Sequence, residues 1–173
     1  MRRLLTSLLL LSAAPVWALS GMSSEIGYAD NARLLRASSV WNLDQRWLSG
    51  AGWHLAPQVH AGIGVWSGTA TQKNTIAEVF VAPSVRYRPN ASSGQQPYVE
   101  AGLGAHLISE SRLDDQRDLG ANLLLSEHLG VGVVFGDRSQ YDLSYRFQLM
   151  DNAGQRATNP GLNAHQVRLL YNY

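Results

Sequence analysis

The chain of 173 residues contains no cysteine and a single lysine, Lys73. Without cysteine there is no disulfide framework, so the fold depends on core packing or on a surrounding lipid phase. The formal net charge is only +1, which argues against a polyanionic partner, so we expect no nucleic acid to bind. Beyond the N-terminus, no stretch is apolar and long enough for a transmembrane helix, which needs about 20 residues.

The N-terminus holds the most apolar run of the sequence. Arg2 and Arg3 precede this run, and Ala18 offers a small residue at a cleavage point. The order of basic, apolar and small residues predicts a signal peptide over residues 1–18, with a buried N-terminal helix as the alternative. Cleavage after Ala18 leaves one domain, residues 19–173, with a net charge of −1 because both arginines are removed.

The rest of the chain consists of short runs in which apolar and polar side chains alternate. In one of them, Leu143 and Tyr145 alternate with Ser144 and Arg146. Alternation with a period of two is the pattern of a β-strand that has one polar and one apolar face. Turn-forming residues separate the runs. We count eight candidate strands, at about 24–32, 34–43, 53–66, 76–88, 97–109, 121–135, 141–151 and 163–173.

The composition of the two faces favours a membrane barrel over a soluble β-domain. The polar face carries small residues and isolated charges of both signs, which suits the narrow interior of an eight-stranded barrel. Glu78 and Glu100 would pair there with Arg86, Arg146 and Arg168. Aromatic residues at strand ends suit interfacial girdles. The sequence therefore predicts an eight-stranded antiparallel up-and-down transmembrane β-barrel. A soluble periplasmic domain would instead bury its apolar faces against each other.

The strand count also places one polar cluster. If both termini are periplasmic, the seventh strand runs outward and ends near Asp151, and the connection 152–162 faces the outside. The stretch FQLMDNAG, residues 147–154, would then lie at the boundary of the outer leaflet. Leu149 and Asp151 would face lipid.

Four stretches between about Pro97 and Gly161 carry a resemblance to a known family. They are PYVEAGLGAHLIS, LGANLLLSEHLGVGVVF, YRFQLMDNAG and NPGLN. In this order they resemble the lipid A 3-O-deacylases, the PagL family of outer-membrane acyl hydrolases. The resemblance implies an eight-stranded barrel in the bacterial outer membrane that hydrolyses the 3-position acyl ester of lipid A. Lipopolysaccharide would be the partner, and the site would lie on the outer surface of the barrel.

The resemblance also implies a triad of His, Ser and Glu, whose positions fall on Leu149, Asp151 and Asn163. Leucine cannot accept a proton, and aspartate is a poor replacement for an activated hydroxyl in acyl transfer to water. Asparagine cannot offer the charge that stabilises an imidazolium. Asn152 and Gly154 match the oxyanion donors of the family. Donors without a nucleophile supply only part of the acceleration.

Two functions are therefore left open. The substitutions favour a lipid A-binding or structural barrel in which 3-O-deacylation is lost or weak. The alternative is an active lipid A 3-O-acyl ester hydrolase with a diverged site, for which Asp151 and His165 form a candidate pair across the hairpin. Glu127 interrupts the apolar face of the sixth strand. It would touch substrate headgroups, line the site, turn inward at a bulge, or pair with a neighbouring arginine.

Four histidines fall on the polar face: His54, His60, His106 and His128. None has the spacing to cysteine or to paired carboxylates that marks a metal site. We expect hydrogen-bonded histidines in the barrel interior, with no metal and no cofactor. The sequence does not decide the oligomeric state, and a homodimer stays open.

Overall fold

The computed structural model describes residues 18–29, 32–50, 52–69, 74–90, 94–115, 117–155 and 161–173. The expected signal peptide, apart from Ala18, lies outside the described residues. The strands within them are antiparallel: β1 (Gly21–Ala29), β2 (Ala32–Asn42), β3 (Trp47–Gly50), β4 (Trp53–Gly68), β5 (Thr75–Pro89), β6 (Gln96–Ile108), β7 (Leu123–Phe135), β8 (Tyr141–Asp151) and β9 (Leu162–Asn172). None of the described residues forms a helix with the length and apolarity to cross a membrane.

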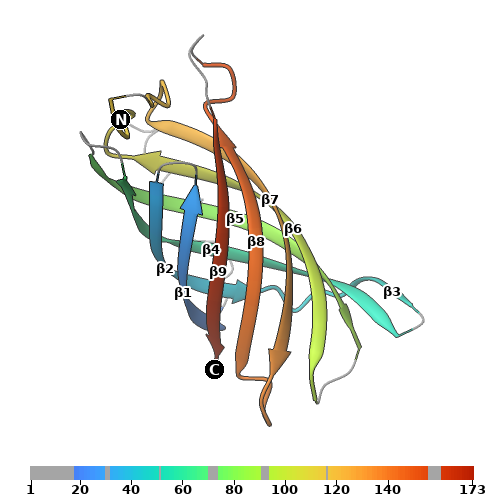
Figure 1. Cartoon of the computed structure of the whole chain (residues 1–173). Coiled ribbons are helices and arrows are strands. Elements are labelled where there is room, and N and C mark those ends of the chain that lie inside the picture. The colour runs from blue at the N-terminus through green and yellow to red at the C-terminus, as the bar shows by residue number, and fades with distance from the viewer. Residues whose placement is uncertain are drawn as a thin grey trace, which may run out of the picture.

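Eight of these strands close into a barrel (Figure 1). Consecutive barrel strands pair with each other, and β9 pairs with β1 to close the barrel. β2 pairs directly with β4, because the short β3 between them in the sequence pairs only with β4. The predicted eight-stranded up-and-down barrel is therefore confirmed. Among the described strands, closure leaves no long sheet edge unpaired, which is what lipid surroundings demand of a β-structure.

Some expected strand bounds were wrong. The first strand is Gly21–Ala29 instead of 24–32, because its alternation of buried and exposed residues already begins at Gly21 and Met22. β2, the second expected strand, begins at Ala32 instead of residue 34. β7, the sixth expected strand, begins at Leu123 instead of residue 121. β3 was not expected, since four residues are too few to show alternation. It pairs with the periplasmic end of β4, which extends beyond β2 (Figure 1).

The polar face of the alternation lies inside the barrel, and the apolar face lies outside. On β4, His60 is 1% exposed and Ile63 is 64% exposed. Glu100 is at the centre of one interior network, where its carboxylate is 2.9 Å from Arg86 Nε, 2.5 Å from Arg146 Nε and 3.5 Å from Arg168 Nη2. The expected pairing of these arginines with Glu100 is thus found.

A second network lies nearer the outer end of the barrel. Arg36 forms ion pairs with Glu25 at 3.0 Å and with Glu78 at 2.8 Å, and His106 Nδ1 is 2.6 Å from Glu78 Oε1. Above it, apolar side chains fill the mouth, including Leu113 and others from the 109–122 connection. The described interior is therefore packed with side chains, as expected for a barrel of this size.

The connections show which end faces outward. The first described residues and the C-terminus lie at the same end as the turn 136–140, which joins β7 to β8. The described parts of the longer connections after β6 and after β8 lie at the other end, toward which β8 points (Figure 1). Outer-membrane barrels have short periplasmic turns and longer extracellular connections. The end of β8 at Asp151 therefore belongs to the outer half, as the strand count predicts.

Candidate functional site

Residues at the three positions expected for a triad lie close together on the outer surface. Leu149 of β8 pairs directly with Asn163 of β9 on one side and with Glu127 of β7 on the other. All three side chains are exposed and face away from the barrel interior. Asp151 lies two residues further along β8 on the same face. The row contains two carboxylates, one amide and one leucine, but no group that can act as a proton-accepting imidazole or an activated hydroxyl.

Glu127 stays on the outward face, because the β7–β8 register runs unbroken from Leu125↔Asp151 to Phe135↔Tyr141. The inward turn at a bulge, which the sequence left open, does not occur. Its cross-strand neighbours are Leu103 on β6 and Leu149 on β8. A carboxylate therefore lies between two leucines on a surface that faces lipid.

Asn152 and Gly154 form part of the turn that ends β8. Asn152 is fully buried, and its Nδ2 donates to the carbonyl of Leu119 at 3.1 Å. The backbone N–H of Gly154 donates to Asn152 Oδ1 at 3.1 Å. Ala153 and Gly154 have positive φ angles of 51° and 74°, a conformation that glycine adopts at no steric cost. In this arrangement both candidate oxyanion donors are bonded within the protein.

His165 is not brought together with Asp151. Its partner on β8 is Phe147, four residues before Asp151 along the strand. His165 Nδ1 is hydrogen-bonded to the Tyr145 hydroxyl at 2.6 Å. Asp151 Oδ1 accepts a hydrogen bond from Ala153 N at 2.6 Å. The two members of the candidate pair thus have separate partners and different heights on the barrel.

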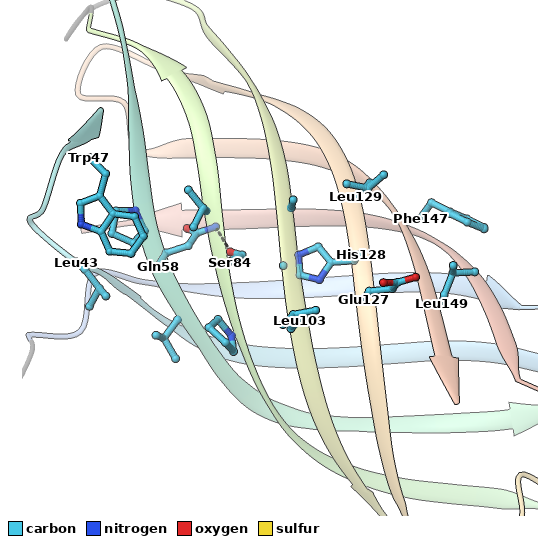
Figure 2. Close-up of a pocket in the computed structure, with 16 residues that line it drawn as sticks. Leu43, Trp47, Gln58, Ser84, Leu103, Glu127, His128, Leu129, Phe147 and Leu149 are labelled. Atoms are coloured by element: carbon cyan, nitrogen blue, oxygen red, sulfur yellow. Dashed lines mark hydrogen bonds between the residues drawn. The ribbon is translucent and has the colours of Figure 1, made fainter. Parts of the chain in front are cut away.

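A groove of about 710 Å³ crosses the outer surface beside this row (Figure 2). Glu127 and Leu149 lie at one end of it, and Leu43 and Trp47, next to and on β3, lie at the other. Its size is within the ~300–1,000 Å³ of typical ligand sites. The outward side chains between the two ends are almost all apolar: Val59, Pro83, Val85, Ala101, Leu103 and Leu129.

Two prolines and a short side chain explain why the surface is hollow there. Pro57 and Pro83 lie inside paired strands, where proline cannot donate to the ladder. The β5–β6 pairing stops after Val81↔Ala105 and resumes at Ser84↔Gly102. With Ala101 as the next outward residue on β6, little side-chain volume covers this part of the wall. The groove was not expected from the sequence, although prolines within two alternating strands were a signal of it.

The stretches that carry the family resemblance supply the barrel interior. Arg146 binds Glu100, and Gln148 Oε1 accepts from Arg36 Nη1 at 2.9 Å. A Cβ on Gly102 would lie 2.7 Å from Pro83 O, so this position has no room for a side chain. These residues shape and stabilise the barrel whether or not a reaction takes place on its surface.

Within the described part of the chain, no group of three or more His, Cys, Asp or Glu side chains could hold a metal ion. His106 bonds to Glu78 and, through Nε2, to Ser126 Oγ at 2.8 Å. His60 lies between Arg146 and Arg168. His54 Nδ1 is 2.7 Å from Asn90 Oδ1, and His128 is near Glu100. The four interior histidines are thus dispersed.

Comparison with known proteins decides the family. A model of the family Lipid A 3-O-deacylase (PagL) matches residues 33–172. The chain belongs to the PagL family. The resemblance inferred from the sequence is thereby confirmed, and with the barrel fold it identifies an outer-membrane protein.

Relatives and solved structures agree with this assignment. The lipid A deacylase PagL of Pseudomonas aeruginosa is 24% identical over 176 residues, covering 96% of each chain. The PagL of Bordetella bronchiseptica is 31% identical over 81 residues, covering 47% of this chain and 44% of that protein. A crystal structure of the outer membrane enzyme PagL has a TM-score of 0.77 at 22% identity, covering 88% of this chain and 99% of that one. The N-terminal barrel of P. aeruginosa OprF is less similar, with a TM-score of 0.50.

Proposed function

We propose that this PagL-family barrel binds lipid A of lipopolysaccharide at the outer leaflet and has lost 3-O-deacylation. The observation that carries the proposal is Leu149, an apolar and exposed side chain where the family resemblance places the catalytic base. Base-activated acyl transfer needs a proton acceptor beside the nucleophile. Leu149 supplies none, and its cross-strand neighbours Glu127 and Asn163 contain no imidazole.

Two further features support binding without hydrolysis. The groove ends at the triad row, so an acyl chain lying in it would bring its ester end toward Leu149 and Asp151. The donors Asn152 and Gly154 remain at the end of β8, bonded to Leu119 and to each other, and donors without a nucleophile supply only part of the acceleration. Lipid A as the ligand is proposed from the family, whose relatives are named lipid A deacylases.

Mass spectrometry of lipid A tests the loss of hydrolysis directly. Lipid A is extracted from cells that express the protein and from cells that do not. We expect the same mass and the same 3-linked acyl chain in both samples. A species lacking one 3-linked hydroxyacyl chain only in expressing cells would establish the alternative, an active hydrolase with a diverged site.

Restoring the triad positions tests whether the scaffold still fits the family reaction. The variant Leu149→His, Asp151→Ser and Asn163→Glu is expected to release the 3-linked chain, because the three positions are neighbours on the same face. The matched control carries Leu149→His, Asp151→Ala and Asn163→Glu, which lacks the nucleophile. Activity in this control would contradict the assigned role of position 151.

We also propose that the chain is exported and cleaved after Ala18. The basic residues, the apolar run and the small residue at the junction support this proposal. The intact mass of the protein purified from outer membranes should correspond to residues 19–173. A mass that includes Arg2 and Arg3 would refute it.

A further inference from the structure

Arg88 lies at the periplasmic mouth of the barrel, and its guanidinium is only partly paired. It directly precedes Pro89, the last residue of β5. Its Nη2 donates to Gln96 Oε1, and Gln96 Nε2 donates to Ser139 Oγ in the turn that joins β7 to β8. Arg88 Nε is buried and has no hydrogen-bond partner among the described residues. A buried donor of a charged group is costly without an acceptor, so this N–H indicates an acceptor from outside the chain.

The charges that act on Arg88 are mainly positive. The guanidiniums of Arg46 and Arg86 repel it, whereas the carboxylate of Asp142 attracts it. Asp142 already binds Arg86 Nη1 at 2.7 Å and accepts a hydrogen bond from the Tyr98 hydroxyl at 2.6 Å. Neither Arg46 nor Arg88 forms an ion pair with a described carboxylate. The periplasmic mouth therefore has positive charge that an added anion would neutralise.

Arg46 brings its charge to this mouth from the connection that leads into β3. It is exposed and directly precedes Trp47, which pairs with Leu55 on the outer face of β4. Because side chains alternate along an extended chain, Arg46 lies on the opposite face from Trp47. That is the face of His54, the direct cross-strand partner of Arg88. Two arginines thus converge on the rim of the barrel, one from the β3 connection and one from the end of β5.

The outer side of the same rim suits contact with lipid. Trp53, at the start of β4, stacks on Tyr87 of β5 with ring centroids 4.9 Å apart. Tyr87 directly precedes Arg88, so the two side chains lie on opposite faces of the barrel wall. Leu48 of β3 is 85% exposed, at the end of β4 that extends beyond β2 (Figure 1). Aromatic residues of membrane barrels lie at the level of the headgroups, so a lipid beside Tyr87 would have its phosphate at the height of the rim.

We propose that Arg46 and Arg88 bind the phosphate of an anionic phospholipid from the periplasmic leaflet. The planar guanidinium matches two oxygens of a phosphate. A zwitterionic lipid would bring its ammonium close to the same two positive charges. Each basic residue near a membrane surface favours an anionic lipid by about fivefold, so the pair should give a preference of tenfold or more. The site lies at the other end of the barrel from Leu149 and Asp151, so the proposal does not rest on lipid A binding.

Native mass spectrometry of the folded, detergent-solubilised barrel measures this preference. The two probes are phosphatidylglycerol and phosphatidylethanolamine with the same acyl chains. The wild-type barrel should retain phosphatidylglycerol at least about tenfold better, and Arg46→Gln and Arg88→Gln should each reduce the preference about fivefold. Arg138→Gln is the matched control, because it removes an exposed arginine from the turn 136–140 at the same end. It should keep the full preference.

Four results would overturn the proposal. The first is equal retention of both lipids by the wild type, and the second is a preference that persists in both Arg46→Gln and Arg88→Gln. The third is an equal loss in Arg138→Gln, which would assign the effect to net charge alone. The fourth is an adduct of inorganic phosphate that depends on both arginines, without a preference between the lipids. The urea midpoint reports whether each variant folds, and Arg46→Gln, in an exposed connection, decides the test if Arg88→Gln does not fold.

Discussion

Replacing Glu100 by glutamine should destabilise the barrel strongly, although the two side chains have nearly the same shape. Glu100 is buried and lies within 3.5 Å of nitrogens of Arg86, Arg146 and Arg168. Removing one partner of a buried ion pair costs about 3–5 kcal/mol. Arg86 keeps a second carboxylate, Asp142 at 2.7 Å, and Arg146 keeps Glu25 at 3.5 Å. These remaining pairs place the expected loss at the lower end, about 3 kcal/mol.

Urea unfolding of the barrel in lipid vesicles measures this loss. With a slope of ~1–3 kcal/mol per molar urea, the midpoint for Glu100→Gln should fall by about 1–3 M. Glu110→Gln is the control, because it changes an exposed carboxylate and should leave the midpoint in place. Equal midpoints for the two variants would show that the interior arginines do not need the charge of Glu100, and the account of the network would be refuted.

Three other outcomes follow from the structure. Gly102→Ala should lower the free energy of unfolding by about 1–3 kcal/mol, and with it the urea midpoint, since its Cβ would meet the His128 ring and a backbone carbonyl. Gly50→Ala has open space and should be neutral. An unchanged midpoint for the first variant would contradict the tight packing at β6. Trp66→Phe should cost about 2 kcal/mol in the same assay, because it removes a donor from the buried Glu78 carboxylate, and a neutral result would refute that bond. The wild-type barrel should show no stable conductance steps in planar bilayers, because side chains fill its interior; regular steps would contradict this packing.

Period-two alternation made the fold predictable, because a barrel with a polar interior and a lipid-facing exterior imposes opposite demands on successive residues. Leu143, Ser144 and Tyr145 show the pattern plainly, and β8 was located correctly from it. The expected first strand was displaced because the three residues between its outward Met22 and Ile26 are all polar, so the apolar face does not show there. β3 was missed because its four residues are too few to show the alternation of apolar and polar side chains. The residues at the expected triad positions, Leu149, Asp151 and Asn163, could be read from the sequence once the flanking matches had aligned it.

The register of the strands decided what the sequence could not. His165 was expected from the sequence to lie across from residues 149–151, but the β8–β9 pairing puts it opposite Phe147. The same pairing, continued through β7, places Glu127 beside Leu149, although the two are 22 positions apart along the chain. Side-chain type and alternation are local properties, so the sequence alone determined the eight strands, their two faces and which residues stand at the expected triad positions. Which residues meet across strands, and where two prolines hollow the wall, depends on the register and closure of the whole barrel, which only the tertiary structure decided.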